Sequence, residues 1–354
     1  MIDVICGDCR DVMQEMDTSS VDAIVTDPPY GRFKSDAWDR QWSTDAQYLD
    51  WLDGLCSEWF RLLKPNGSLY VFASPRMSAR VEVKIGERFN VLNRVTWAKP
   101  PFATKAEMFD KDSCRLFFPV SESIIFAEHH GADNIAKGEA GYEAKCDELR
   151  GFVFEPLRAY LDDERKRAGV NFEQVRQGVG CADGSGLPSH WFTHSQWALP
   201  TAANYAKLQE LFNAQSANGT EYLRREYEDL RREYEDLRRP FNVTADVPYT
   251  DVWTFDTVRA YPGKHPCEKP LDLMRHIIES STRPDAVVYD PFMGSGSTGV
   301  ACAQLGRSFI GSELSPDYTE QARQRIAKVQ PSYITCRNPT ANVVTPELEQ
   351  LGLF

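Results

Sequence analysis

A stretch near the C-terminal end of the chain constrains its fold more than any other. Residues 287–289 form an apolar run that predicts a buried strand, and this run leads into Asp290-Pro291-Phe292-Met293-Gly294-Ser295-Gly296. A helix is expected over 299–305 and a second strand over 308–311, and Glu313 follows that strand. A strand, a glycine-containing turn, a helix and a strand in this order predict a Rossmann-like sheet.

The glycine-containing turn is suited to a small ligand. Gly294 and Gly296 allow the backbone to approach a ligand closely, and the helix start around Thr298 presents free N–H groups. Rossmann-like sheets hold a ribose diol with an acid at the end of the second strand, which is here Glu313. A dinucleotide site would need a third spaced glycine and a loop that favours anions. Because the loop instead carries Asp290, a ligand with an ammonium group is favoured.

Strands and helices alternate through the rest of the two chain ends. Further strands are expected over 2–6, 21–26, 68–73, 91–97, 121–127 and 252–255, and helices over 9–16, 46–63 and 271–281. This alternation predicts an α/β fold with a doubly wound, Rossmann-like sheet. Its first half would comprise residues 1–130 and its cofactor-binding half residues 251–330, and 331–354 would form a C-terminal tail.

The expected strand over 21–26 ends in a rigid polar turn, Asp27-Pro28-Pro29-Tyr30. Each proline fixes its own φ angle and restricts the residue before it, so Asp27 and Tyr30 are held in place before a substrate arrives. The Asp27 carboxylate and the Pro28 carbonyl can accept from one NH2 group, and the Tyr30 ring can stack on a flat heterocycle. The turn therefore predicts a site that grips the exocyclic amine of a planar base. The alternative is a proline-rich loop in which Asp27 only caps the backbone.

Together the two motifs closely resemble the β group of S-adenosylmethionine-dependent DNA amino-methyltransferases. The signature of that family is Asp/Asn/Ser-Pro-Pro-Tyr/Phe, it precedes the cofactor loop, and the recognition region lies between them, as in this chain. The resemblance covers about 1–130 and 251–330. It implies a methyltransferase sheet with permuted motif order, S-adenosylmethionine as the cofactor, and no metal.

The resemblance also implies roles for individual residues. Asp8, with its neighbour Cys9, would contact the cofactor's adenine, Asp290 and Phe292 would line the cofactor, Glu313 would hold the ribose, and Lys269 with Pro270 would lie near the methionine tail. From the spacing alone, Asp8 is equally suited to cap the helix over 9–16.

The reaction implied by the resemblance is methylation of the adenine N6 amine in double-stranded DNA. The target base would be flipped from the duplex, stacked on Tyr30, and bonded through its amine to Asp27 and the Pro28 carbonyl. Cytosine-N4 methylation uses the same turn, but its enzymes usually carry Ser at the position of Asp27, which favours adenine. An alternative from another class is a catalytically silent DNA-binding regulator. Against it stand four intact residues: Asp27, Tyr30, Asp290 and Glu313.

Residues 131–250 show a different pattern, which predicts a helical insertion for target recognition. Helices are expected over 155–167, 171–177, 190–197 and 201–212, and they loosely resemble a helix-turn-helix. In this interpretation 190–197 is the recognition helix, and its DNA-reading side chains are His190, Thr193, His194 and Gln196. The alternative is an insertion that only packs. His190 and His194 have a spacing that suits zinc, but no nearby Glu or Cys completes a metal site.

A seven-residue repeat covers 226–239. Each unit places a Tyr and a Leu three residues apart, among alternating acidic and basic residues, which indicates a solvated helix with ion pairs. Two roles stay open for this helix: spacing the insertion from the catalytic halves, or pairing with a second copy of the chain in a homodimer.

Composition limits the location and the partners. The chain has 354 residues and a net charge of −12, which weighs weakly against DNA, although a basic cleft can lie in an acidic protein. The nine cysteines have no paired metal-site spacing and are expected to be reduced, in the cytoplasm. No signal-peptide pattern and no run of 18 apolar residues occur, so no membrane contact is expected. Whether a restriction nuclease accompanies the chain in a restriction-modification pair is left open.

Overall fold

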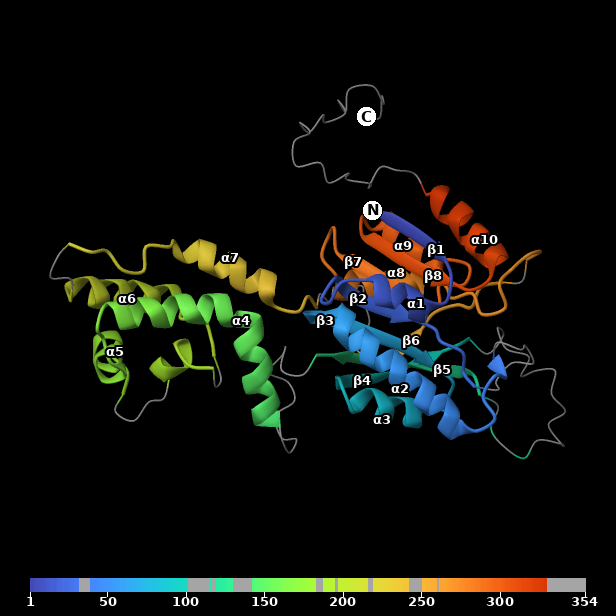
Figure 1. The fold of residues 1–354 in the computed structure, drawn as a ribbon, viewed down its shortest axis with the longest axis horizontal. Helices are drawn as coiled ribbons and strands as arrows, with labels where there is room; N and C mark the ends of the chain where they lie inside the picture. Colours follow the sequence, from blue (N-terminus) through green and yellow to red (C-terminus); the bar gives the residue numbers. More distant parts are fainter. Residues whose placement is uncertain are drawn as a thin grey trace, which may run out of the picture.

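The computed structural model describes residues 1–31, 39–100, 115, 117, 119–129, 142–182, 187–194, 197–215, 219–241, 250–259 and 261–329. Within these ranges the strands form one sheet of eight in the order β1-β8-β7-β2-β3-β5-β4-β6 (Figure 1). The strands are β1 (Ile2–Cys6), β2 (Val21–Thr26), β3 (Leu63–Ala73), β4 (Asn90–Ala98), β5 (Ser121–Glu128), β6 (Val252–Thr254), β7 (Val287–Asp290) and β8 (Ser308–Glu313). All neighbours pair in parallel except β5, which is antiparallel to both β3 and β4.

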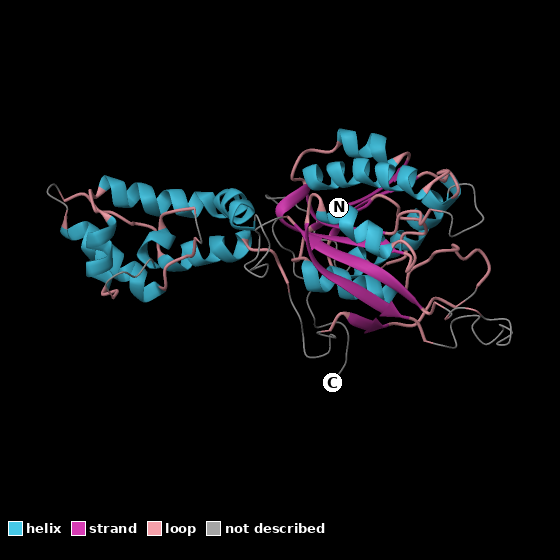
Figure 2. Ribbon diagram, turned by 90° about the horizontal axis from the view of Figure 1, so that it is seen from below, coloured by secondary structure: helices cyan, strands magenta, loops and turns pink. Residues whose placement is uncertain are grey.

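Helices cover both faces of this sheet (Figure 2). One face packs against α1 (Cys9–Glu15), α2 (Asp45–Leu62) and α3 (Ser78–Gly86), and the other against α8 (Leu271–Ser281), α9 (Ser297–Gln304) and α10 (Pro316–Ala327). Successive strand residues point to opposite faces, so Ile24 and Leu69 enter the first core while Val25 and Tyr70 enter the second. The expected doubly wound α/β fold is therefore confirmed.

The strand order reverses between β2 and β7, which pair through Ala23 and Val288. The chain continues from β2 to β3 on one side of this point and from β7 to β8 on the other. Asp27, directly after β2, and Asp290, the last residue of β7, consequently meet at the carboxyl edge of the sheet. Open α/β sheets bind their ligands at such a crevice.

The insertion forms a separate lobe with its own core, on the left of Figure 1. It contains α4 (Tyr142–Arg167), α5 (Phe172–Val179), the 3-10 helix η4 (Leu187–Trp191), α6 (Ala202–Ala214) and α7 (Tyr227–Leu237). The seven-residue repeat forms α7, and its Leu230 is fully buried while Tyr227, Tyr234 and Leu237 pack against the same core. The Tyr/Leu stripe is thus used inside the insertion, which removes it as a surface for pairing with a second copy.

The α-helix expected over 190–197 is wrong. The chain forms η4 and then a turn, and Trp191, Phe192 and Trp197 all enter the core of the insertion. On an α-helix these three positions would point in three different directions, because successive residues are rotated by about 100°. The irregular path buries all three and lets the Trp197 indole donate to the Trp191 carbonyl at 2.9 Å. The helix-turn-helix interpretation therefore loses its recognition helix.

Several expected segments lie outside the described residues, namely Gln196, 131–141, 242–249 and the tail after 329. Within the described ranges, no helix combines the length and the apolar character that a membrane crossing requires.

Candidate active site

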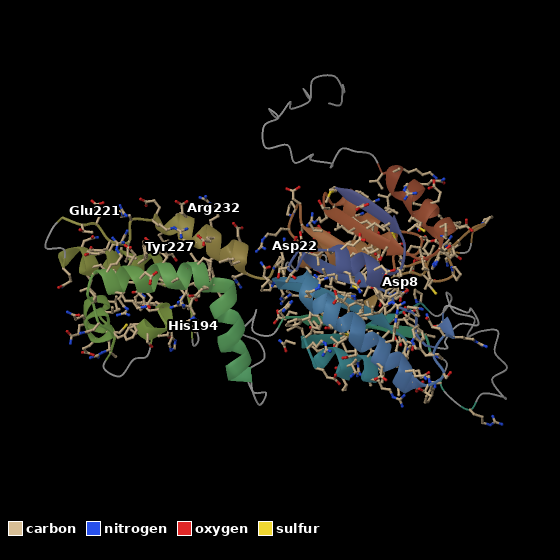
Figure 3. All side chains as sticks on the ribbon, viewed as in Figure 1. Asp8, Asp22, His194, Glu221, Tyr227 and Arg232 are labelled. Atoms are coloured by element: carbon tan, nitrogen blue, oxygen red, sulfur yellow. The ribbon has the colours of Figure 1, made fainter. Side chains whose placement is uncertain are left out.

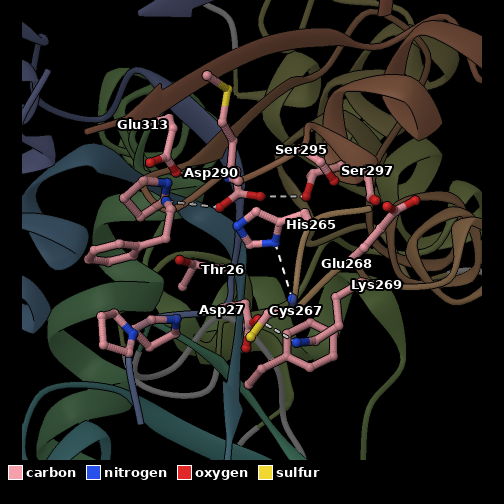
Figure 4. A pocket seen from close by; sticks show the side chains of 18 of the residues that line it. Thr26, Asp27, His265, Cys267, Glu268, Lys269, Asp290, Ser295, Ser297 and Glu313 are labelled. Carbon is pink, nitrogen blue, oxygen red and sulfur yellow. Dashed lines mark hydrogen bonds and ion pairs between the residues drawn. The ribbon is translucent and has the colours of Figure 1, made fainter. Parts of the chain in front are cut away.

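A cavity of about 530 Å³ opens at the carboxyl edge where β2 and β7 meet (Figure 4). Most of the residues that the sequence assigned to catalysis or to the cofactor line it: Asp8, Cys9, Asp27, Pro28, Pro29, Tyr30, Lys269, Asp290, Phe292, Gly294, Thr298 and Glu313. The Asp27 turn and the Asp290 loop lie more than 250 residues apart in the sequence, and the switch in strand order brings them to one cavity.

Two expected cofactor residues do not line the cavity. Pro270 is the N-cap residue directly before α8, and it is buried. Gly296 has a φ angle of 78°, and an added Cβ would lie 2.8 Å from the Cβ of Ala322 on α10. Glycine is therefore required here by the turn and by helix packing, so the close approach expected for this position is to α10 and not to a ligand.

The expected DNA-reading residues lie in the insertion and not at the cavity. Figure 3 shows His194 on that lobe, away from Asp8 at the sheet. The His194 side chain is 53% exposed, with its Nε2 3.3 Å from Glu155. The Thr193 hydroxyl donates to the Ser189 carbonyl at 3.0 Å, so it is already satisfied within the lobe.

Asp27 is held by two side chains of its own chain. The Tyr30 hydroxyl lies 2.7 Å from Asp27 Oδ1, and the Lys269 ammonium forms an ion pair with Asp27 Oδ2 (Figure 4). Both partners also reach Glu122: its Oε2 lies 3.0 Å from the Tyr30 hydroxyl and 3.5 Å from Lys269 Nζ. Lys99 pairs with the other Glu122 oxygen. Two acids and two lysines therefore form one network around the tyrosine.

The charges of this network shift its pKa values. Burial raises the pKa of Asp27 and is only partly offset by Lys269. Burial would also raise the pKa of Glu122, but Lys269 and Lys99 together lower it to about 2. Burial opposes the charge of Lys269 as well, yet Asp27 and Glu122 raise its pKa above the ordinary value. Glu122 and Lys269 are thus held in their charged forms, while Asp27 depends on its neighbours.

The opposite end of the cavity carries two further carboxylates. Asp290 accepts from the Thr298 hydroxyl at 2.5 Å and from the Phe292 N–H at 3.1 Å, and burial raises its pKa to about 7. Glu313 accepts from the N–H groups of Gly294 at 3.2 Å and Ser315 at 2.8 Å, and burial raises its pKa. Each acid keeps lone pairs for a ligand.

Asp8 both caps α1 and lines the cavity, the two positions that its spacing in the sequence allowed. Its side chain caps α1 by accepting from the Arg10 N–H at 2.9 Å, and it pairs with the Arg10 guanidinium at 2.6 Å. These bonds lower the pKa of Asp8. Asp8 and Cys9 also line the cavity, where burial raises the pKa of the Cys9 thiol to about 12 and keeps it neutral.

The cavity wall fits a ligand such as S-adenosylmethionine, which carries a cation, hydroxyls and a flat ring. Thr26 and Ser297 line it, and their buried hydroxyls have no hydrogen-bond partner among the described residues. A Cβ added to Gly294 would lie 3.1 Å from the His265 ring, so glycine leaves needed space. Asp290 can meet an ammonium group and Glu313 a diol.

Sequence reasoning missed Glu122 and did not place Lys99 in this site. Glu122 lies near the start of β5, and Lys99 directly follows β4. Because β5 runs antiparallel to β3 and β4, its beginning reaches the same edge as the end of β4, where Glu122 pairs in register with Trp97. A polar residue at the start of a strand can be assigned to the carboxyl edge of the sheet only when the strand is known to be antiparallel.

Comparisons with known proteins agree with this geometry. The family described as DNA methylase matches residues 21–324. A DNA adenine methyltransferase of Escherichia coli (strain K12), YhdJ, is 23% identical over 327 residues, covering 91% of this chain and 82% of the relative. The type II methyltransferase M2.MboI of Moraxella bovis is 25% identical over 340 residues, covering 92% and 87%. Among solved structures, the cytosine-N4-specific PvuII DNA methyltransferase matches with a TM-score of 0.51 at 14% identity, covering 90% of this chain and 84% of that chain, and it supports the fold.

Proposed function

This chain belongs to the DNA methylase family, and we propose that it transfers a methyl group from S-adenosylmethionine to the N6 amine of adenine in double-stranded DNA. One observation carries the proposal: the Asp27 turn, the loop that begins at Asp290 and the end of β8 at Glu313 line a single cavity. Adenine is favoured over cytosine because Asp27 stands where cytosine-N4 enzymes usually carry Ser. The similarity to an adenine methyltransferase of E. coli points the same way.

The Asp27 turn would hold the target base. The adenine leaves the duplex, since its amine is otherwise out of reach. The face of the Tyr30 ring stacks on the base while its hydroxyl, bonded to Asp27 and Glu122, fixes the plane of the ring. Asp27 and the Pro28 carbonyl accept from the NH2 group, which directs the nitrogen lone pair away from the ring system. The negative charge of Asp27 also stabilises the positive charge that develops on nitrogen.

The other end of the cavity would hold the cofactor, which supplies an electrophilic methyl group when bound. Asp290 would accept from its ammonium group and Glu313 from its ribose hydroxyls, Phe292 would line the cofactor, and Asp8 would contact the adenine. Cys9, Gly294 and Thr298 complete this wall. Alignment and fixed charges then supply most of the catalysis.

The insertion would choose the DNA sequence. It forms a lobe of its own beside the sheet, and its exposed polar residues include His194 (Figure 3). In the sequence, residues 151–240 carry 12 basic and 14 acidic side chains. Because this region has no excess of positive charge, recognition would depend on a few specific contacts. The similarity to M2.MboI makes a cognate restriction nuclease a partner to test for.

Mass spectrometry of nucleosides, from DNA treated with the enzyme and labelled cofactor, tests the proposal. Label is expected in N6-methyladenine, and Asp27→Ala should lower turnover at least ~10²-fold, the scale of removing one electrostatic group. Asp11→Ala, an exposed carboxylate on α1, is the matched control and should leave turnover unchanged. Label in N4-methylcytosine alone would show that adenine is not the target base. Label in no base would show that the chain is not a DNA methyltransferase.

A further inference from the structure

We infer that Lys269 and Glu122 are positioning residues for methyl transfer: Glu122 holds the Lys269 ammonium beside Asp27, and the ammonium keeps Asp27 ionised and fixes its carboxylate. The inference rests on the proposed function, because it concerns the group that would accept from the target amine. It assigns Lys269 to the base end of the cavity, whereas the resemblance placed it near the methionine tail.

The position of Lys269 is built by three separate segments. It precedes α8, while Asp27 follows β2 and Glu122 belongs to β5. The side chains of Lys269, Glu122 and Asp27 are only 9%, 15% and 19% exposed. An ammonium group this deeply buried requires counter-charges, and the two acids supply them. The geometry therefore commits the ammonium to these two carboxylates.

Glu122 fixes both groups that touch Asp27. Its Oε2 lies 3.0 Å from the Tyr30 hydroxyl and 3.5 Å from Lys269 Nζ, and its other oxygen is held by Lys99. Tyr30 and Lys269 each occupy one lone-pair site on a different oxygen of Asp27. A carboxylate has about four such sites, so Asp27 can still accept from an amine while its orientation is fixed.

The charge of Asp27 depends on this arrangement. A protonated Asp27 would lose both an acceptor site and the negative charge that stabilises the methylated nitrogen. Among the residues that the structure describes, the charged and titratable groups that act on Asp27 are Lys269, Glu122, Tyr30, Tyr48 and Asp290. Among these, Lys269 alone is positive, and its attraction opposes the effect of burial, which raises the pKa of Asp27.

The dependence of kcat on pH, at saturating cofactor and DNA, tests the inference. Saturation keeps the titration of Asp290 in the free enzyme out of the profile, since kcat reports the bound state. Lys269→Met should lower kcat and move the acid limb to higher pH by about one unit or more, because Asp27 loses its cation. Lys269→Arg retains the charge and should keep the limb near its wild-type position. Lys64→Met removes a more exposed lysine that pairs with Asp22, and should change neither kcat nor the limb.

Glu122→Gln gives a second, opposite test that keeps the size of the side chain. The variant removes a negative charge near Asp27, and the Lys269 ammonium then pairs with Asp27 alone of these two acids. The pKa of Asp27 should fall, so the acid limb of kcat should move to lower pH. Turnover should fall about ten-fold, because the Gln amide carries no charge and offers only one oxygen, so either Tyr30 and Lys269 or Lys99 loses its acceptor. A merely structural role would lower kcat without moving either limb.

Two outcomes would overturn the inference while the enzyme remains a methyltransferase. One is acid limbs that stay in place in both variants. The other is a Lys269→Met variant that binds S-adenosylmethionine more than ten-fold more weakly by calorimetry with an unmoved limb, which would assign Lys269 to the cofactor. A wild-type enzyme that labels no base overturns the proposed function, and this inference with it.

Discussion

Arg239 forms a buried ion pair with Glu128, and this pair joins the insertion to the sheet. Arg239 follows α7 and Glu128 ends β5, and their side chains are 2% and 0% exposed. Glu128 also accepts from Asn90 at 3.2 Å, and the guanidinium lies 5.3 Å from the ring centres of both Phe126 and Phe241. Because a buried charge that loses its partner is strongly destabilising, this contact helps to hold the insertion against the sheet.

Removing one member of this pair is expected to destabilise the protein strongly. Arg239→Met leaves the Glu128 charge buried, which costs about 3–5 kcal/mol of unfolding free energy. The double variant Arg239→Met/Glu128→Leu should recover much of that loss, since no charge is stranded. Urea unfolding measures both. Arg238→Met, in an exposed pair with Glu235, is the control and should stay within about 0.5 kcal/mol of the wild type. A similar loss in the control would show that the buried pair is not special.

Cofactor affinity is expected to depend on Asp290 and on pH. Asp290→Ala should weaken S-adenosylmethionine binding about ten-fold or more, the usual effect of losing a charge-assisted bond. Because the pKa of Asp290 is about 7 and an ammonium prefers the ionised acid, affinity should fall as the pH drops below 7. Binding near this pH should release a proton, which calorimetry in buffers of different ionisation enthalpy detects. Asp27→Ala should keep the affinity within a few-fold, and an unchanged Kd in Asp290→Ala would refute the assignment.

The two glycines of the cofactor loop are expected to differ. Gly296→Ala places a methyl group against Ala322 at a positive φ angle, so it should cost about 1–3 kcal/mol of stability. Gly294 also has a positive φ angle, of 50°, so Gly294→Ala should cost stability as well, but its methyl group points at the His265 ring beside the cavity and should in addition weaken cofactor binding. Thermal unfolding and calorimetry separate the two effects. Equal melting temperatures for Gly296→Ala and the wild type would contradict the packing role.

Site choice is expected to follow the insertion. The double variant His190→Ala/His194→Ala should relax the preferred DNA sequence, as read by sequencing of methylated DNA, while the cofactor still binds. Arg232→Ala is the matched control, because Arg232 is 72% exposed and lies on the opposite side of the lobe from His194 in Figure 3. An unchanged preference in the double variant would move recognition elsewhere, with the region 100–118 as the next candidate; of that region only Pro100, Arg115 and Phe117 are described.

The parts of the fold that could be predicted are those with local causes. The β2 strand and the Asp27 turn, or β7 and its glycine loop, are set by neighbouring residues, so their patterns are readable. The helix α10 was also readable: Ser315 caps it, Pro316 opens it, and Ala322 and Ile326 are four apart and buried. The helix was not among the expected elements, although these signals are all local.

The remaining features depend on distant segments. The Glu122 contact with Lys269 needs the direction of β5, and the path after Trp191 is set by a core that α4, α6 and α7 complete. Neither the Glu122 contact nor this path can be predicted from the neighbouring residues in the sequence. Charges that cross between segments, such as Lys269 with Asp27, are invisible to spacing because 242 residues separate them.

Two substitutions of Tyr30 should separate the work of its ring from that of its hydroxyl. Tyr30→Phe keeps the face that stacks on the flipped base and loses the bonds to Asp27 and Glu122. Tyr30→Ala loses both, and stacking alone is worth about 1–3 kcal/mol per base, or about 5- to 150-fold in affinity.

Fluorescence of DNA that carries 2-aminopurine at the target position reports base flipping, and single-turnover rates report the transfer step. Tyr30→Phe should flip the base nearly as well as the wild type but transfer the methyl group several-fold more slowly, because the plane of the ring and Asp27 are less well fixed. Tyr30→Ala should fail to accumulate the flipped base. If Tyr30→Phe loses flipping to the same extent as Tyr30→Ala, the hydroxyl and not the stacking face is what Tyr30 contributes to holding the base.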